Sequence, residues 1–291
     1  MSNRGEFARN IDQVLLNKLK SDDVFKNKLL EDIAQKHNVF AALRNNRMDF
    51  YFKGGKLFSF DQKGLSTHIK YATTPEDNVG NYVTENDFPE ICKGLAKSFE
   101  KDYEKIKKNC GLYSKASEAD CVSCLWRKYS FANTSEDIVV LDIEISLKSE
   151  EDNGRKQDRI DVLLYSNKER ALKFIEAKLY ANNEIRSTTE PAIVNQIERY
   201  NNQIKAKESK ILAEYKKYID VMKELFLLKI EEPVKVLPEV GLYIFGFDDD
   251  QKKGNLRRIQ QKLDQKHIKY YSLGNPTNIR INALWSAVTK L

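Results

Sequence analysis

Long hydrophobic runs are missing from the chain, since it contains no stretch of about 18 consecutive apolar residues. The sequence therefore predicts no transmembrane helix. The first residues, MSNRGEFARNIDQ, are polar and lack the apolar segment of a secretory signal. We therefore expect a cytoplasmic protein with no membrane partner.

Histidine and cysteine are scarce, with 3 and 4 residues respectively. The histidines are scattered and form no pair at a metal-binding spacing. Disulfides are not expected in a cytoplasmic protein. Cys121 and Cys124, however, have the two-residue spacing that lets two thiolates bind one metal ion. Together with Cys110 they are candidate zinc ligands, although neither Cys110 nor Cys92 has a recognised spacing; ordinary thiols are the alternative.

No G-x-x-x-x-G-K-[ST] loop occurs, so an ATP-driven activity would need a separate subunit. What the chain has in excess is basic charge, with 49 Lys and Arg against 43 Asp and Glu, a net charge of +6. Such a surplus suits a polyanionic partner, although a solvated lysine-rich surface gives the same total. The segments KDYEKIKK and KKGNLRR are the candidates for contact with phosphates.

The hydrophobic pattern predicts an α/β (α+β) protein with two domains. Residues 1–90 combine two helices, within 6–37, with an aromatic β-hairpin at Gly54-Gly55. Residues 91–291 begin with a basic helix and then favour a mixed central sheet flanked by helices. The strands expected there are 137–148, 159–166, 171–179, 239–247 and 268–273. The helices expected there are 91–109, one from Pro191 with Ile193, Ile197, Tyr200 and Ile204 buried, 207–229 and 255–267.

Charged residues interrupt two of these strands. Asp161 lies on the second strand, and Glu176 and Lys178 share one face of the third. If the turn at 167–170 pairs these strands, the three side chains converge on one patch. Two neighbouring carboxylates call for a cation, and hard oxygen ligands suit Mg²⁺. The alternative is an exposed sheet face, where these charges contact only solvent.

The order of these residues resembles the PD-(D/E)XK nuclease superfamily, which has the restriction-endonuclease-like fold. The motif stands as Ile160-Asp161, fourteen intervening residues, and then Glu176-Ala177-Lys178. Ile160 replaces the proline that is frequent in the superfamily. In the following helix, Gln196 and Tyr200 resemble the Q-x-x-x-Y element of the RecB-like branch. The resemblance covers roughly residues 95–275.

The resemblance implies further site residues and cofactors. Asp161 and Glu176 would hold Mg²⁺ or Mn²⁺, and Lys178 would position or deprotonate water. The superfamily often adds one more acid, for which we expect Glu144. The alternatives for that acid are Asp142, on the same polar face of the first strand, and Glu100 or Glu104. An iron–sulfur cluster occurs in some RecB-like nucleases, but the cysteines here all precede the core, which favours zinc.

The function implied is a metal-dependent nuclease that hydrolyses phosphodiester bonds in DNA, or in RNA, as an endo- or exonuclease. Restriction, phage defence and DNA repair are compatible roles, and a homodimer is left open. The alternative is a nucleic-acid-binding module that keeps the fold without cutting. A third hypothesis is that residues 1–90 gate catalysis, with the aromatic hairpin as a reader of a partner or signal.

Overall fold

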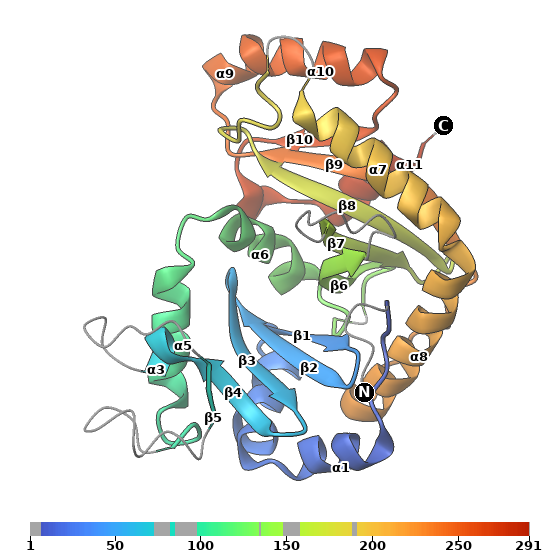
Figure 1. The fold of residues 1–291 in the computed structure, drawn as a ribbon. Coiled ribbons are helices and arrows are strands. Elements are labelled where there is room, and N and C mark those ends of the chain that lie inside the picture. The colour runs from blue at the N-terminus through green and yellow to red at the C-terminus, as the bar shows by residue number, and fades with distance from the viewer. Residues whose placement is uncertain are drawn as a thin grey trace, which may run out of the picture. The chain divides into compact units, whose positions relative to one another are not determined.

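The computed structural model describes residues 7–72, 82–84, 98–133, 135–147, 158–187 and 191–290 (Figure 1). The chain divides into two compact units. Unit 1 comprises Met1–Phe7, Thr134–Lys216 and Ile230–Leu291, and unit 2 comprises Ala8–Asn133 and Lys217–Lys229. The units are therefore divided differently from the predicted domains, whose boundary was expected near residue 90. Of the long helix α8 (Glu208–Phe226), the first part belongs to unit 1 and the second part to unit 2.

Unit 2 is built on an antiparallel sheet in the order β1-β2-β3-β4-β5. Its strands are β1 (Val39–Arg44), β2 (Arg47–Phe52), β3 (Gly55–Asp61), β4 (Gly64–His68) and β5 (Tyr82–Thr84). Its helices are α1 (Gln13–Ser21), a π-helical turn (Phe25–Leu29), α2 (Leu30–Ala34), α3 (Ile69–Ala72), α5 (Tyr103–Tyr113) and α6 (Glu118–Tyr129). The hairpin predicted at Gly54-Gly55 is confirmed as the turn between β2 and β3.

The aromatic residues of this hairpin form the core of unit 2. Phe50, Phe58 and Phe60 are buried, and the Phe58 ring lies 5.2 Å from that of Phe99 and 6.1 Å from that of Tyr103. Burial of such rings is the main favourable contribution to folding of a small sheet. The three phenylalanines therefore serve packing, and they do not offer an exposed reader surface.

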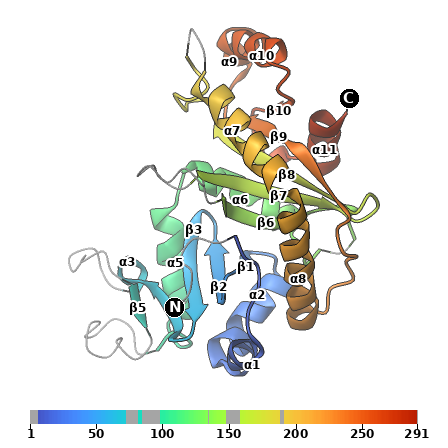
Figure 2. The same cartoon turned by 45° about the vertical axis from the view of Figure 1, so that its right-hand side comes forward.

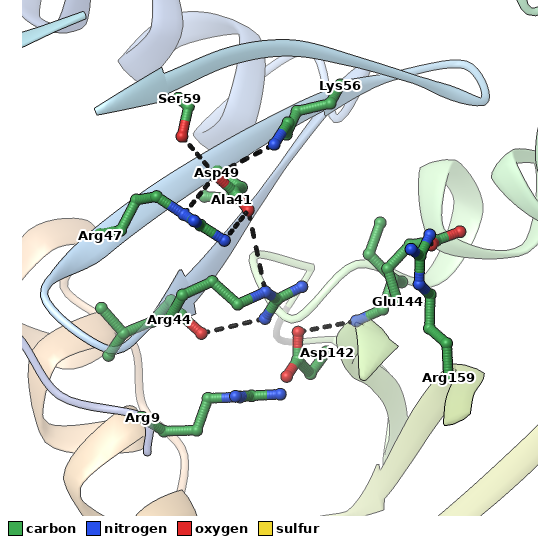
Figure 3. Close-up of polar contacts among 12 residues, drawn as sticks. Arg9, Ala41, Arg44, Arg47, Asp49, Lys56, Ser59, Asp142, Glu144 and Arg159 are labelled. Carbon is green, nitrogen blue, oxygen red and sulfur yellow. Dashed lines mark hydrogen bonds and ion pairs between the residues drawn. The ribbon is translucent and has the colours of Figure 1, made fainter. Parts of the chain in front are cut away.

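The other face of this sheet carries a buried carboxylate. Asp49 on β2 accepts a hydrogen bond from Ser59 at 2.5 Å and forms an ion pair with Arg47, whose Nε lies 3.0 Å from Asp49 Oδ1 (Figure 3). Arg44 and Lys56 lie farther from this carboxylate: Arg44 Nε is 3.9 Å from Asp49 Oδ2, and Lys56 Nζ is 4.0 Å from Asp49 Oδ1. A buried charge is tolerated only when it is paired and hydrogen-bonded, as this carboxylate is.

Unit 1 contains a mixed sheet in the order β10-β9-β8-β7-β6. β6, β7 and β8 are antiparallel neighbours, whereas β9 is parallel to both β8 and β10. The strands are β6 (Ile138–Leu147), β7 (Asp158–Ser166), β8 (Ala171–Leu179), β9 (Lys235–Phe245) and β10 (Tyr270–Leu273). The helices are α7 (Ala192–Ala206), α9 (Asp249–Lys253), α10 (Asn255–Gln265), a 3₁₀ turn (Pro276–Asn278) and α11 (Ile281–Thr289).

Helices cover both faces of this sheet, with α7 on one face and α11 on the other (Figures 1 and 2). Asn201 of α7 accepts a hydrogen bond from the Val240 backbone N–H on β9 at 2.7 Å. The next residue, Gly241, faces α11, where a Cβ atom would lie only 2.7 Å from that of Val288. The lack of a side chain at Gly241 therefore lets α11 approach the sheet closely.

The coarse fold class is confirmed: the protein is a mixed α+β chain with antiparallel and mixed sheets flanked by helices. The helix predicted from Pro191 is also confirmed, with Pro191 as the residue before its first turn and all four expected stripe residues buried. The predicted basic helix 91–109 is only partly within the described residues, and there it begins at Tyr103. None of the helices in the described ranges has the length and hydrophobicity needed to cross a lipid bilayer.

Candidate active site

Asp161 lies where β7 and β8 stop pairing. The antiparallel ladder ends at Val162 and Ile175, and Asp161 and Glu176 are the next residues along the two strands. In place of a backbone contact, Asp161 Oδ2 accepts a hydrogen bond from the Ala177 backbone N–H at 2.8 Å. Asp161 remains partly exposed to solvent. The Asp161 carboxylate therefore lies between β7 and β8 where they separate, beside the triplet Glu176-Ala177-Lys178.

Lys178 lies between two carboxylates. Its Nζ is 2.9 Å from Glu176 Oε1 and 2.8 Å from Glu184 Oε2. Glu176 and Lys178 are buried, whereas Glu184 is partly exposed, in the turn segment that follows β8. The structure therefore brings together Asp161, Glu176 and Lys178, as the sequence predicts. Glu184 also contacts Lys178, and no pattern in the sequence predicts this contact.

Helix α7 contributes two polar side chains to this site. Gln196 Nε2 donates to Glu176 Oε1 at 2.9 Å and to the Tyr200 hydroxyl at 2.8 Å. The Tyr200 hydroxyl in turn donates to the Arg159 backbone carbonyl on β7 at 2.7 Å. The two residues are one helical turn apart and thus lie on the same face of α7. A continuous hydrogen-bonded chain therefore connects α7 to both strands of the site.

Glu144 lies opposite Asp161 on the neighbouring strand. Ile143 and Ile145 pair with Val162 and Ile160, so the intervening Glu144 and Asp161 are at the same level. The carboxylate of Glu144 forms an ion pair with Arg159, whose Nη1 is 2.6 Å from Glu144 Oε2 (Figure 3). Glu144 also has a positive φ of 53°, an uncommon backbone conformation for a residue other than glycine.

Asp142 is buried, whereas Glu144 is partly exposed, so the expectation that Asp142 lies on an exposed polar face with Glu144 is wrong. The register of β6 shifts between Val140 and Asp142, a β-bulge that comes before Asp142 and leaves the pairing from Asp142 to Leu147 in step. Its Oδ2 accepts from the Tyr215 hydroxyl of α8 at 2.9 Å. Its Oδ1 accepts from the Ile143 backbone N–H at 2.8 Å (Figure 3). Asp142 is therefore held by structural contacts within unit 1.

The site residues perturb one another's protonation. Burial, followed by the nearby Glu176 carboxylate, raises the pKa of Asp161 well above its usual value, and Glu144 adds to this effect. Burial alone would lower the pKa of Lys178, but the carboxylates of Glu176 and Glu184 raise it above its usual range. Lys178 is thus an ammonium group in this arrangement, suited to donating hydrogen bonds and to stabilising negative charge.

The other acids considered for the site lie in unit 2. Glu100 accepts a hydrogen bond from Asn27 at 2.8 Å, and Glu104 is exposed on α5, with its Oε2 4.0 Å from Lys107 Nζ. Asp161, by contrast, belongs to unit 1. Of Glu144 and Asp142, the two candidates in unit 1, Glu144 is the one that lies beside Asp161.

The cysteines are free thiols where they are described. Cys110 is buried on α5, and burial raises its pKa to about 12. Cys121 and Cys124 are partly exposed, one turn apart on α6, and burial also raises the pKa of both. Zinc ligands need the thiolate form, which these environments disfavour. Cys92 lies outside the described residues, so the zinc and iron–sulfur hypotheses stay predictions.

The donor set at Asp161 and Glu176 fits a hard divalent ion. Within the described ranges, no group of three or more His, Cys, Asp or Glu side chains is arranged to hold a metal. Mg²⁺, however, is commonly held by one or two carboxylates, with water and substrate phosphate completing its shell. Asp161 is partly exposed, and its pKa is raised by burial and then by the nearby acids, whose negative charge a cation would offset. These two carboxylates are therefore the residues that would hold Mg²⁺ or Mn²⁺.

Comparison with known proteins adds no relative. A scan against protein-family models gave no match, and searches of the curated proteins and of the solved structures gave none either. The chemistry of this site is therefore argued from its own residues.

Proposed function

We propose that the chain is a metal-dependent nuclease with a restriction-endonuclease-like core, and that it hydrolyses phosphodiester bonds in DNA. The observation that carries this proposal is that Asp161, Glu176 and the Lys178 ammonium lie close together where β7 and β8 stop pairing. Support for the fold comes from the antiparallel β6-β7-β8 meander, followed by α7 and the parallel strand β9. The hydrophobic pattern of the sequence predicts this order of strands and helices.

Each residue has a role that follows from its contacts. Asp161 and Glu176 would bind the metal, which when present lowers the pKa of a bound water and offsets charge on the scissile phosphate. Lys178 donates hydrogen bonds toward the water or the phosphate oxygens, since it is held as an ammonium. Gln196 orients the Glu176 carboxylate, and Tyr200 fixes Gln196 relative to β7. Glu184 forms a second ion pair with Lys178 and so helps to hold its position.

The test is incubation of the pure protein with linear, circular and single-stranded DNA, and with RNA, in Mg²⁺ or Mn²⁺. We expect DNA cleavage that requires the metal and falls by at least about 100-fold in Asp161→Asn and in Lys178→Met. Supercoiled circles separate endonuclease from exonuclease activity, because an exonuclease needs an end.

Lys173 provides a matched control for Lys178. It is also a buried lysine on β8, but it lies an odd number of residues away and so points to the opposite face of the sheet. Burial lowers its pKa to about 8, so Lys173→Met replaces a poorly solvated amine with an apolar chain of similar length. We expect Lys173→Met to cleave like the unmodified protein. Binding of nucleic acid without cleavage in any metal would instead favour the non-cutting module.

A further inference from the structure

Helix α10 carries a row of cations along one flank. Arg258, Lys262 and Lys266 follow one another at intervals of four residues, with Lys266 as the residue that ends the helix. Four residues advance about 6 Å along a helix, and the three side chains therefore form a line. The buried stripe of the same helix consists of Leu256, Ile259 and Leu263. Arg258 and Lys266 are exposed and Lys262 is partly exposed. We call these three residues the basic row.

The basic row is connected to the candidate active site through the segment after β8. Lys262 Nζ donates to the Ser187 backbone carbonyl at 3.1 Å. Three residues earlier in the same segment, Glu184 forms its 2.8 Å ion pair with Lys178. Arg186 lies between them in sequence, is exposed, and places its guanidinium 5.7 Å from the centre of the Tyr180 ring. All of these residues belong to unit 1.

The basic row concentrates positive charge on one flank of α10. The single acid within α10 is Asp264, whose Oδ2 accepts from the Tyr270 hydroxyl at 3.5 Å. Like charges four residues apart on a helix repel each other. A ligand with regularly spaced negative charges therefore complements this flank.

We propose that the basic row and Arg186 bind the phosphate backbone of the nucleic acid strand that enters the candidate active site. This inference rests on the proposed function for the identity of the ligand, because a phosphodiester chain is the substrate of a nuclease. Guanidinium and ammonium groups in a line match successive phosphates and read no base, so binding is independent of sequence.

The other basic segment of the sequence is less suited to this role. On α5, Lys107 is buried and its Nζ lies 2.5 Å from Asp32 Oδ2, so its charge is used inside unit 2. Lys105 and Lys108 on the same helix are exposed. They provide a control pair with the same charge as Arg258 and Lys266, in the unit that does not contain Asp161.

The experiment measures binding of a fluorescently labelled, single-stranded 30-nucleotide DNA to the full chain without divalent metal, across a series of salt concentrations. The double variant Arg258→Gln/Lys266→Gln keeps Lys262, whose hydrogen bond to Ser187 supports the segment. We expect roughly tenfold weaker binding. The slope of log K against log salt should decrease by about 1.4, because each ion pair with a phosphate adds about 0.7 to the slope for a single strand.

The control variant Lys105→Gln/Lys108→Gln should bind within about twofold of the unmodified chain, with the same salt slope. Circular dichroism melting of both variants confirms that they fold. The inference is overturned if the two variants lose affinity equally, if the α10 variant binds normally, or if the unmodified chain binds no nucleic acid. If the unmodified chain does not cleave with metal but the α10 variant still binds more weakly as expected, the result counts against the nuclease proposal. The assignment of the basic row as a surface that binds phosphate backbone would then still hold.

Discussion

At the scale of single residues, Asp161 is in an environment that opposes its own charge. Burial and the neighbouring acids Glu176 and Glu144 all raise its pKa, while the Ala177 backbone N–H and Lys178 act in the other direction with smaller effect. A carboxyl group whose pKa is raised on folding is disfavoured as an anion in the folded state. Its ionisation therefore lowers stability when no cation is present.

We predict that Asp161→Asn makes the metal-free protein more stable at pH 8, by a few degrees in Tm. Asparagine keeps the oxygen that accepts from Ala177 and removes the charge. The free energy of unfolding of the unmodified chain should fall as pH rises from about 3.9, the unfolded pKa, through the raised folded pKa. The difference between the two proteins should therefore shrink toward zero near pH 4. Thermal melts at several pH values measure this.

A control for this prediction is Asp220→Asn, which changes an exposed acid on α8. Because this side chain is exposed, the Tm of Asp220→Asn at pH 8 should be close to that of the unmodified chain. An Asp161→Asn protein that is less stable than the unmodified chain at pH 8 would contradict the account of Asp161.

Residue types and spacing were enough to predict that one group of side chains lies together, because a strand repeats every two residues and a helix face about every four. The group consists of Asp161, Glu176, Lys178, Gln196 and Tyr200. The sequence does not predict the position of Glu184, because Glu184 lies in an irregular segment after β8. In such a segment no period indicates in which direction a side chain points. The sequence does not predict the burial of Asp142, because its carboxylate contacts Tyr215 of α8, 73 residues later, and the local alternation of β6 does not contain that contact.

At the scale of elements, α7 fixes the two strands of the site relative to each other. Tyr200 is buried and bonds to Arg159 on β7, and Gln196 bonds to Glu176 on β8. One hydroxyl group joins these two contacts, because it also accepts from Gln196.

We predict that Tyr200→Phe lowers the free energy of unfolding by about 1–3 kcal/mol, because it removes two partly buried hydrogen bonds at once. It should also reduce cleavage, since Gln196 is then less firmly oriented toward Glu176. Urea denaturation and the cleavage assay measure the two effects. The matched control is Tyr218→Phe in unit 2, whose hydroxyl donates to the Ala41 carbonyl at a longer 3.4 Å. If Tyr218→Phe reduced cleavage as much, the role assigned to α7 would be wrong.

The periodicity of the sequence predicted the long elements better than the short ones. The sequence prediction for the region of α6 concerns only its cysteine pair and does not include a helix. The structure shows a helix there with a buried stripe, formed by Val122, Leu125, Trp126 and Tyr129. α11 was also missed; it is a nine-residue helix whose packing against β9 decides its structure. Short helices depend on tertiary contacts, which a local pattern does not contain.

At the scale of the whole molecule, the segments of each unit are far apart in sequence. The second part of α8 belongs to unit 2, where the Phe226 ring lies 6.3 Å from that of Phe25 and 5.7 Å from that of Phe131. The boundary near residue 90 that the hydrophobic pattern predicts separates Phe25 from both of these rings. No composition shift marks contacts between such distant segments.

We predict that a fragment of residues 91–291 does not fold as an independent nuclease. It would expose Phe99, Phe131 and Phe226, whose ring partners Phe58, Phe40 and Phe25 are removed. Solubility and a thermal melt of the fragment beside the full chain measure this. A soluble fragment with a cooperative melt and metal-dependent cleavage would contradict the division into units.

The central claim is that a divalent ion binds between Asp161 and Glu176. The most direct measurement is X-ray diffraction from crystals grown with Mn²⁺, with data collected to record its anomalous signal. The account predicts one or two anomalous peaks within bonding distance of the Asp161 and Glu176 carboxylates, and no peak there in Asp161→Asn crystals. A well-ordered site without a peak, with Lys178 still paired to Glu176 in saturating Mn²⁺, would contradict it.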